Sequence, residues 1–590
     1  MVTHSFASPD KLPAETQVLI SGGGPSGLFL ALDLASRGIP SLVVEPRNSV
    51  DHARPRAKTT NARTMTHLRR LGLAEALRAA SPLPVSYSQD VSFCTGLTGP
   101  AAHELRRFRH AFQLVPGRYG PQPECGQQVP QPMLEEVLRA AVAGSPLVTM
   151  ATGWSTETVE AVADATGPEA RYTTLLSGPS GAIHSIDAGF VIGADGASSA
   201  VRRSLGIRLE GGSAALSNIS ILFRSSGLAA AVELDPAVQY WVVGADTSGM
   251  VGPVDLKGTW WAIIQGVNAR ETVNTARAGQ MVRSLVGDDV DIQVLATDPW
   301  TARMLLAPKY RRGGVFLVGD AAHLNPPWGG HGFNTCVGDA ANLAWKIAAV
   351  LDGWGGNALL DSYEAERRPV AARTIGDAAA NGKALAYHFA DPALLADGDA
   401  GAAARHAARE ALTVKQSEFD SLGLVLGYAY GDSPVVVPDG TPIPVEDPIV
   451  YVPSASPGAL LPHAWLDRSA SVYDLLGKGF TLLVDEAALA GRPAAEIFAP
   501  VAQNGSRNGI PVAIAAVGPF DDGTSPSELW GADAVLVRPD QHVAWRGNSA
   551  EAAATALAVA AGCSWQGNRE QQQNQHNEQK GRARAHVVVP

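Results

Sequence analysis

A strand, a glycine-rich turn, a helix and a second strand follow one another near the start of the chain. The β-branched and apolar residues 17–21 predict a strand, which runs directly into the turn GGGPSG at 22–27. Apolar residues at helical spacing predict a helix over 26–37, and a second strand over 41–44 ends at Glu45. This order predicts a parallel βαβ unit of the kind that binds dinucleotides.

Each glycine of this turn has its own physical role. Gly22 permits the tight turn, Gly24 lets backbone approach a pyrophosphate, and Gly27 lets the helix pack closely on the strand. The carboxylate of Glu45 lies where it can accept hydrogen bonds from a ribose. We therefore expect a dinucleotide cofactor to contact this unit, with Gly22, Gly24, Pro25, Ser26, Gly27, Glu45, Pro46 and Arg47 as the candidate binding residues.

A second strand–loop–helix pattern occupies residues 313–351. A buried strand is predicted over 315–318, Gly319 and Asp320 form a turn, and a Pro/Gly-rich loop leads into a helix from Phe333. The free N–H groups and dipole at a helix start favour a bound group that becomes anionic, as a reduced flavin does. Taken alone, the pattern also suits an ordinary crossover.

Three further segments can serve the same nucleotide. The strand at 190–194 runs into Asp195-Gly196, a turn that is common as plain punctuation but here lies between the two glycine motifs. Gln131 stands just before an amphipathic helix that ends near residue 143, where its amide can reach a cofactor. Arginines before a helix expected over 64–80 can neutralise a pyrophosphate, or form a solvated basic turn.

Residues 216–267 are rich in strand-forming and aromatic residues. Such a sheet can roof a pocket for a planar apolar ligand, although each aromatic side chain also suits a simple core. The candidate pocket residues are Tyr240, Trp241, Trp260, Trp261 and, in the glycine loop, Pro326.

The last third of the chain has a different pattern. Residues 415–469 are a Pro-rich connector, and a new α/β pattern follows. Strands are expected over 480–484 and 510–517, a hairpin over 534–537 and 542–545, and helices over 486–499 and 551–561. This order suits a thioredoxin-like unit, without a CxxC pair for disulfide chemistry. Residues 564–590 are polar and low in complexity, so we expect a disordered tail.

Composition excludes several classes of function. The chain has 590 residues and a net charge of −11, without the basic block that nucleic acid or an anionic membrane would need. It lacks an apolar run of about 18–20 residues and a signal-peptide pattern at its start. Its four cysteines form no metal-ligand spacing. We therefore expect a cytoplasmic protein without a metal site or a disulfide framework.

Together these motifs resemble those of class A flavoprotein monooxygenases, in the aromatic (phenol) hydroxylase family with the para-hydroxybenzoate hydroxylase fold. The resemblance covers residues 16–563. It rests on GGGPSG at 22–27, GADGASSAVRR at 193–203 and GDAAHLNPPWGGHGFNTCVGDAANLAWK at 319–346, supported by ARTMTHLRRLGL at 62–73 and ERRP at 366–369. The segments GKGFTLLV and AVLVRPDQHVAWRG resemble the redox-inactive thioredoxin-like domain of larger members.

The resemblance implies an α/β architecture with a Rossmann-type FAD-binding domain over residues 1–414. A β-rich substrate domain is inserted at about 85–125 and 205–300, and a linker with the thioredoxin-like domain follows over 415–563. The FAD contacts that it implies, beyond the first glycine unit, are Arg56, Gln131, Asp195, Gly319, Asp320, Pro327, Gly330, Gly332, Phe333 and Asn334.

Three residues depart from the family pattern beside the flavin. His331 stands for the usual Gln, Trp328 for a smaller residue, and Arg54 where some phenol hydroxylases carry a pocket His. His331 and Trp328 are expected near the pyrimidine end of the flavin. We transfer no catalytic acid/base pair.

The same resemblance implies that the chain is a monooxygenase. It also implies a homodimer, because members of this family are usually homodimers. NADPH or NADH reduces FAD, and O2 then forms a flavin hydroperoxide that hydroxylates a small phenolic or aromatic substrate. One alternative is Baeyer–Villiger insertion or epoxidation of a polyketide-like substrate. An alternative of another class is a flavin-binding redox sensor or interaction protein. A disulfide reductase is excluded, because no cysteine pair follows the first glycine motif.

Overall fold

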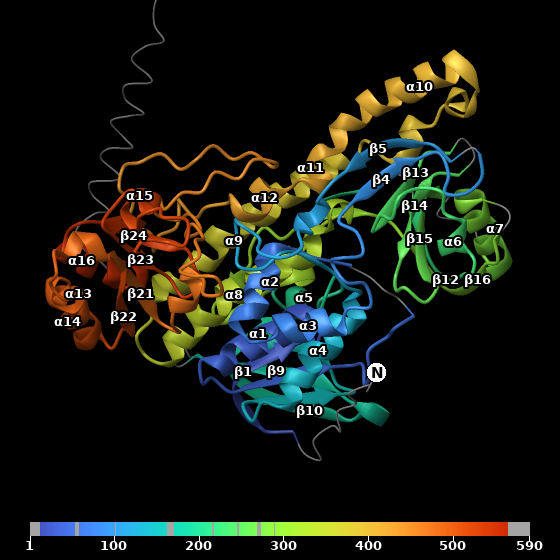
Figure 1. Cartoon of the computed structure of the whole chain (residues 1–590). Helices are drawn as coiled ribbons and strands as arrows, with labels where there is room; N and C mark the ends of the chain where they lie inside the picture. Colours follow the sequence, from blue (N-terminus) through green and yellow to red (C-terminus); the bar gives the residue numbers. More distant parts are fainter. Residues whose placement is uncertain are drawn as a thin grey trace, which may run out of the picture.

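The computed structural model describes residues 12–53, 58–100, 102–161, 170–214, 217–244, 247–267, 273–287 and 290–563. Figure 1 shows three sheet-containing units, with the N-terminal unit below the centre, a second unit at the right and a C-terminal unit at the left. Two long helices, α8 (His331–Leu351) and α9 (Asn357–Asn381), run between the N-terminal and C-terminal units. Within the described ranges, no helix is both long and apolar enough to cross a membrane.

The N-terminal unit is built on an eight-stranded sheet with a parallel centre. Its main path has the order β18-β19-β10-β1-β2-β7, with β8 and β9 added antiparallel beside β10. The strands are β1 (Glu15–Ser21), β2 (Ser41–Glu45), β7 (Val148–Thr152), β8 (Ser155–Ala161), β9 (Tyr172–Ser177), β10 (Ile183–Gly193), β18 (Arg311–Arg312) and β19 (Val315–Leu317). The helices α1 (Pro25–Ser36), α4 (Gln131–Ala143) and α8 contribute to its core.

This strand order brings the three sequence motifs together. The strands β1, β10 and β19 are parallel neighbours, and each of them leads directly into one motif. Because the carboxyl ends of parallel neighbours lie at the same edge of a sheet, segments far apart in the sequence meet there. The core beneath that edge consists of the apolar residues of the strands and of α1 and α8.

The second unit is a seven-stranded sheet in the order β16-β12-β15-β14-β13-β4-β5. The helix α7 (Thr275–Val286) packs on one of its faces. Its strands are β4 (Val91–Cys94), β5 (Glu104–Phe108), β12 (Ser217–Arg224), β13 (Gln239–Val242), β14 (Gly249–Pro253), β15 (Thr259–Val267) and β16 (Gln293–Trp300). The expected β-rich region is therefore a single sheet whose two opposite faces belong to different cores.

The C-terminal unit has a four-stranded sheet in the order β22-β21-β23-β24. Its strands are β21 (Phe480–Asp485), β22 (Val512–Val517), β23 (Ala534–Val537) and β24 (Val543–Gly547), and its larger helices are α14 (Ala499–Asn508) and α16 (Ala550–Ala560). The three units confirm the expected fold class. The domain boundary near residue 414 stays a prediction, and the expected tail at 564–590 lies outside the described residues.

The remaining elements are short, apart from one exposed helix. The helix α10 (Gly398–Ala411) lies against β5 at the upper right of Figure 1. The others are β3 (Thr59–Thr60), β6 (Gln127–Gln128), β11 (Glu210–Ser213), β17 (Arg303–Leu306), β20 (His323–Leu324), α2 (Ala62–Arg70), α3 (Ala74–Ala80), α5 (Ala200–Ser204), α6 (Leu228–Ala231), α11 (Gln416–Phe419), α12 (Leu422–Leu426), α13 (Ala494–Ile497) and α15 (Pro526–Trp530).

Two predicted helices are wrong in their extent. The helix expected over 64–80 is divided into α2 and α3 by a turn at 71–73. The helix expected over 486–499 is a short 3-10 turn followed by α13 and α14. Ala490 adopts a left-handed conformation with φ of 49°, and Pro493 cannot donate the hydrogen bond that a continuous helix would need.

Buried charges join α8 and α9 to the C-terminal unit. Glu366 accepts hydrogen bonds from Arg538 Nη1 and Nη2 at 2.7 and 2.8 Å and from Lys346 Nζ at 2.6 Å. Arg538 also donates to Asp540 at 2.6 Å, and Asn342 bridges Glu366 and Asp540. All five side chains are buried. Two cations are thus balanced by two carboxylates away from water.

Candidate active site

A cleft of about 320 Å³ opens at the edge where β1, β10 and β19 end. It is lined by parts of all three motifs, and the strand order explains why they meet. The lining residues that the sequence predicted are Gly24, Pro25, Ser26, Gln131, Asp320, Pro326, Pro327, Gly330, Gly332 and Phe333. Sequence reasoning missed Thr59, Ala194, Gly196, Asn325 and Cys336, although all of these except Thr59 lie inside the second or third motif.

The first glycine turn packs against the second motif. A Cβ atom on Gly22, whose φ is 108°, would lie 2.2 Å from the carbonyl oxygen of Ala194. A Cβ atom on Gly27 would lie 2.0 Å from the carbonyl oxygen of Gly22. Both positions therefore require glycine for the fold of the turn. Gly24 has open space where a Cβ would project, on the side of the cleft.

Glu45 holds this turn from the second strand. Its carboxylate accepts hydrogen bonds from Gly23 N at 2.7 Å and from the backbone and side-chain nitrogens of Arg47 at 2.9 and 2.7 Å. Pro46 is exposed. Arg47 also pairs with Glu135, which accepts from the cleft residue Gln131 at 2.8 Å. The predicted ribose acceptor is thus already tied to the turn and to α4.

Two helices begin at the cleft. No side chain caps the N-terminus of α1, which begins at Pro25, or that of α8, which follows Gly330. Residues of both first turns line the cleft. The positive ends of two helix dipoles are therefore directed at one space, which favours an anionic group there.

Asp320 is exposed to the cleft at the turn after β19. The neighbouring residue Gly319 donates its N–H to Asp339 at 3.2 Å, and Asp339 also accepts from His323 at 2.8 Å and from Arg367 at 2.9 Å. This buried network fixes the turn that presents Asp320. Arg367 belongs to the ERRP segment at 366–369, which therefore has a structural role in this network.

Two buried polar atoms have no partner in the described structure, one on the lining residue Asn325 and one on Asp195, which lies between the lining residues Ala194 and Gly196. Asp195 accepts hydrogen bonds from Ala200 N and Val201 N through Oδ2, which caps α5, but its Oδ1 is unpaired. Burial raises the pKa of Asp195 above its ordinary value. The Nδ2 atom of Asn325, which lines the cleft, is also unpaired. Such atoms suit a polar ligand that completes their hydrogen bonds.

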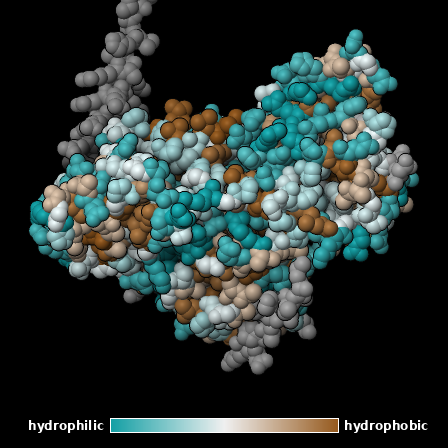
Figure 2. Space-filling view, in the orientation of Figure 1, coloured by the Kyte–Doolittle hydropathy of each residue, from teal (hydrophilic) through white to brown (hydrophobic). Residues whose placement is uncertain are grey.

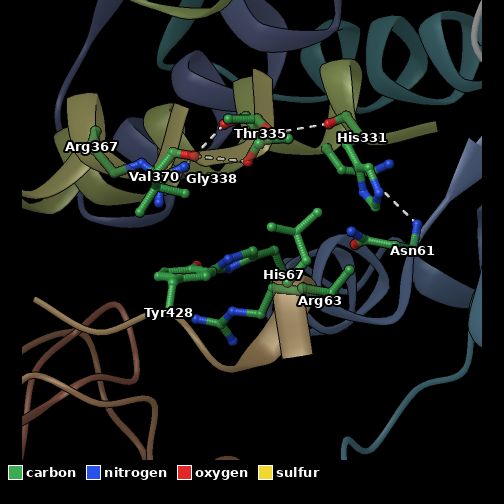
Figure 3. Close-up of a pocket in the computed structure, with 13 residues that line it drawn as sticks. Asn61, Arg63, His67, His331, Thr335, Gly338, Arg367, Val370 and Tyr428 are labelled. Atoms are coloured by element: carbon green, nitrogen blue, oxygen red, sulfur yellow. Dashed lines mark hydrogen bonds between the residues drawn. The ribbon is translucent and has the colours of Figure 1, made fainter. Parts of the chain in front are cut away.

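Three predicted flavin-side residues do not line the cleft. The side chain of Asn334 donates to Thr59 O and Gly330 O and accepts from Asn61 N, so it fastens α8 to β3. Trp328 packs in the core beneath the second sheet, close to Gly382. His331 is buried and faces a separate internal cavity (Figure 3). Arg54 and Arg56 lie outside the described residues.

Helix geometry explains the position of His331. Successive residues of an α-helix are rotated by about 100°, so neighbours in the sequence project to different sides. One face of the first turns of α8 lines the cleft with Gly332, Phe333 and Cys336, and the opposite face lines the internal cavity with His331, Asn334, Thr335 and Gly338.

Strand geometry likewise divides the four aromatic candidates. Tyr240 and Trp260 pack with α7 on one face of the second sheet, away from the glycine loop. Trp241 and Trp261 lie on the other face, in the same core as Trp328. Alternate residues of a strand point to opposite faces, so each adjacent pair is split. None of the four candidates lines the cleft, and only Trp241 and Trp261 share a core with Trp328 of the glycine loop.

Lys58 is a residue that sequence reasoning missed. It directly precedes Thr59 of the cleft wall, and its Nζ atom lies 2.9 Å from the ring centroid of Trp261. Burial lowers the pKa of the Lys58 amine well below its ordinary range. Its carbonyl oxygen accepts from Val129 N at 2.7 Å, which fixes the backbone. No local pattern singled it out, because Trp261 is distant in the sequence.

The connector supports the glycine loop from behind. Glu418 of α11 is buried and pairs with Lys415, and α11 contacts the turn at Trp328–Gly330. Lys415 Nζ also donates to Asn381 O at 3.1 Å and lies over the ring of Trp241. The loop at the cleft is thus held by a buried ion pair from outside the motif.

Comparisons with known proteins agree with this geometry. A family model described as FAD binding domain matches residues 15–378, and one described as aromatic-ring hydroxylase, C-terminal, matches 454–568. A 2,4-dichlorophenol 6-monooxygenase of Cupriavidus pinatubonensis is 32% identical over 583 residues, which cover 91% of this chain and 94% of that protein.

Two solved structures share the fold over nearly the whole chain. A structure of RebC with bound 7-carboxy-K252c has a TM-score of 0.82 and 31% identity, covering 94% of this chain and 100% of that one. The flavin-dependent monooxygenase PieE, in complex with FAD and substrate, has a TM-score of 0.82 and 28% identity, covering 94% and 99%.

Proposed function

The chain belongs to the family of FAD-binding aromatic-ring hydroxylases, and from this premise we propose how its residues perform the reaction. It is a monooxygenase that uses FAD, NAD(P)H and O2 to hydroxylate a phenolic or aromatic substrate. Baeyer–Villiger insertion, epoxidation and a redox-sensor role are not favoured by these relatives.

The residues of the cleft fit FAD. The turn at Gly22, Gly24 and Gly27 and the start of α1 suit the pyrophosphate, and Asp320 suits the ribityl hydroxyls. The unpaired atoms Asp195 Oδ1 and Asn325 Nδ2 offer an acceptor and a donor to the same molecule. The observation that carries this assignment is the convergence of two uncapped helix N-termini on one cleft.

Bound FAD, reduced by NAD(P)H, supplies the activation of O2. The chain orients the reactants and excludes water from the site. The backbone N–H groups at the start of α8 favour negative charge beside Gly330 and Phe333. We place the aromatic substrate in the cleft against this loop, on the side where Thr59 of the wall leads to Lys58 and Trp261.

We further propose that Lys58 accepts the proton of the phenol. Hydroxylation of a phenol ring is helped by removal of the hydroxyl proton, and a half-buried lysine with a lowered pKa is a suitable base. Nζ of Lys58 lies against Trp261, and the next residue is part of the cleft wall. The lowered pKa leaves this amine uncharged at a lower pH than an exposed lysine.

Substituting Asp320 by alanine is expected to weaken FAD binding by about 10- to 100-fold. A hydrogen bond to a charged group contributes about 1.5–3 kcal/mol, and the exposed carboxylate has no substitute in the loop. Quenching of flavin fluorescence during titration of the apoprotein measures the Kd. Asp352→Ala, at an exposed position after α8, is the control and should leave the Kd within about twofold. An unchanged Kd in Asp320→Ala would refute the assignment.

The activity is tested by NAD(P)H consumption of the FAD-loaded protein with a panel of simple phenols. One phenol should accelerate consumption about tenfold or more and appear as hydroxylated product in matching amount. Hydrogen peroxide is measured in the same samples, because unproductive turnover releases it. If no phenol accelerates NAD(P)H consumption, or if the only product is hydrogen peroxide, hydroxylation of simple phenols would be contradicted.

We infer a homodimer in the cytoplasm as the working state of the protein. Figure 2 shows hydrophobic residues gathered over the connector, where Val445, Val450 and Val452 are 91%, 58% and 50% exposed. Exposed apolar patches of this kind often serve in association. The four cysteines are free, as expected in a reducing compartment. Light scattering after size-exclusion chromatography should give twice the mass of one chain.

A further inference from the structure

A small internal cavity lies on the opposite side of α8 from the cleft. Its volume is about 30 Å³, and its walls come from α8, α9, the start of α2 and the segment 424–428 (Figure 3). This space has room for about two water molecules or for one small inorganic ion. None of the steps proposed for hydroxylation uses it.

Three buried nitrogen atoms at this cavity have no hydrogen-bond partner in the described structure. They are Arg63 Nε, His67 Nδ1 and His331 Nε2, on residues that are 5%, 3% and 4% exposed. Figure 3 shows His331 on one wall and Arg63 and His67 on the opposite wall. Burial lowers the pKa of both imidazoles, that of His331 to about 4, so each ring is neutral and has one N–H. With that proton on the nitrogen that faces the cavity, the two rings and Arg63 Nε offer three donors to one space, and a bound acceptor would complete their hydrogen bonds.

The charge around the cavity favours an anion over water. The other nitrogens of the Arg63 guanidinium bind neutral acceptors, namely Gln541 Oε1 and the carbonyl oxygen of Asp540. Arg367 also lines the cavity, and it shares its carboxylate, Asp339, with His323. Among the described residues that line the cavity, none is Asp or Glu. Water would complete the hydrogen bonds but would leave the buried cation without a counter-charge.

We propose that this cavity binds one monovalent inorganic anion, chloride in the cell. A halide satisfies donors from several directions and fits the volume, whereas phosphate or sulfate is too large. Bound there, the anion connects α8 to α2 and fixes the wall behind the glycine loop. The site is independent of the proposed substrate, because its residues face away from the cleft.

A crystal of the FAD-loaded protein grown in bromide locates the ion directly. Diffraction near the bromine absorption edge should give an anomalous peak inside the cavity, between His331 Nε2 and Arg63 Nε. Density without an anomalous signal would mean water and would overturn the proposal. Activity is not part of this measurement, so its outcome does not depend on the proposed function.

Calorimetry of the FAD-loaded protein tests binding in solution. Replacing gluconate, which is too large for the cavity, by chloride or bromide at equal ionic strength should raise the unfolding temperature by about 2 °C or more. His67→Phe keeps an aromatic ring beside Phe29 but removes the nitrogen, and it should lose at least about half of this shift.

Trp530→Phe is the matched control for the calorimetry. Trp530 Nε1 is also buried and unpaired, but it lies in the core of the C-terminal unit, so this variant should keep the full halide shift. His331→Leu replaces His67→Phe if that variant does not fold. An equal shift in the cavity variants and the control, or no shift in the wild type, would overturn the proposal.

Discussion

Replacing Lys58 by methionine lowers kcat/KM for the phenolic substrate by about 100-fold or more, the usual contribution of a positioned general base. Methionine keeps the length and the packing against Trp261 but cannot accept a proton. FAD binding should be unchanged, because the cofactor residues of the cleft are untouched. Steady-state kinetics with the phenol identified in the panel measure the effect.

The pH dependence distinguishes a base from a simple cation. A base works in its uncharged form, so the wild-type rate should fall as the pH falls through the lowered pKa of Lys58. This acid limb should disappear in Lys58→Met. The difference between the two proteins should shrink at high pH, where the phenol ionises in solution without help from the protein.

Lys58→Arg separates the two roles. Arginine keeps a permanent positive charge but does not accept a proton at these pH values. If Lys58 acts as the base, this variant should be nearly as slow as Lys58→Met. An arginine variant with wild-type kcat/KM would show that only the positive charge is needed, and would contradict the proposed proton transfer.

Replacing Glu366 by alanine is expected to destabilise the folded protein by about 3–5 kcal/mol, the usual cost of leaving a buried charge without its partner. Burial favours the neutral carboxyl, yet Arg538 and Lys346 hold the pKa of Glu366 far below its ordinary value. Burial lowers the pKa of Lys346 to about 8 even beside this carboxylate. Without Glu366, Lys346 loses its carboxylate partner and Arg538 keeps only Asp540.

Urea unfolding followed by tryptophan fluorescence measures this loss, with twelve tryptophans in the chain as probes. The control is Glu496→Ala, because Glu496 forms one ion pair with Arg492 in which both side chains are about 60% exposed. An exposed pair contributes about 0–1 kcal/mol, so the control should unfold almost like the wild type. Similar unfolding of the two variants would refute the stabilising role of the buried charges.

Local patterns in the sequence predicted the elements that carry the cofactor site. The strand–turn–helix order around GGGPSG and the loop before Phe333 each depend on neighbouring residues, through turn chemistry and periodicity. Because β1, β10 and β19 each run directly into a motif, the parallel strand order was enough to bring the motifs together. The same helix and strand periodicities place His331 on the other side of α8 from Phe333, and Tyr240 on the other face of the sheet from Trp241. The sequence prediction did not use them to separate these residues.

The sequence by itself therefore determined the fold class and most of the cleft, because these follow from short-range patterns of glycine, proline and apolar residues. Only the tertiary structure decided which charged residues are buried and what they contact. Lys58 contacts Trp261, Glu366 binds Arg538, and His331 lies opposite Arg63 in one cavity. The two residues of each pair are far apart in the sequence. The energy of such contacts depends on burial and on the partner, and neither is encoded in the residues beside them.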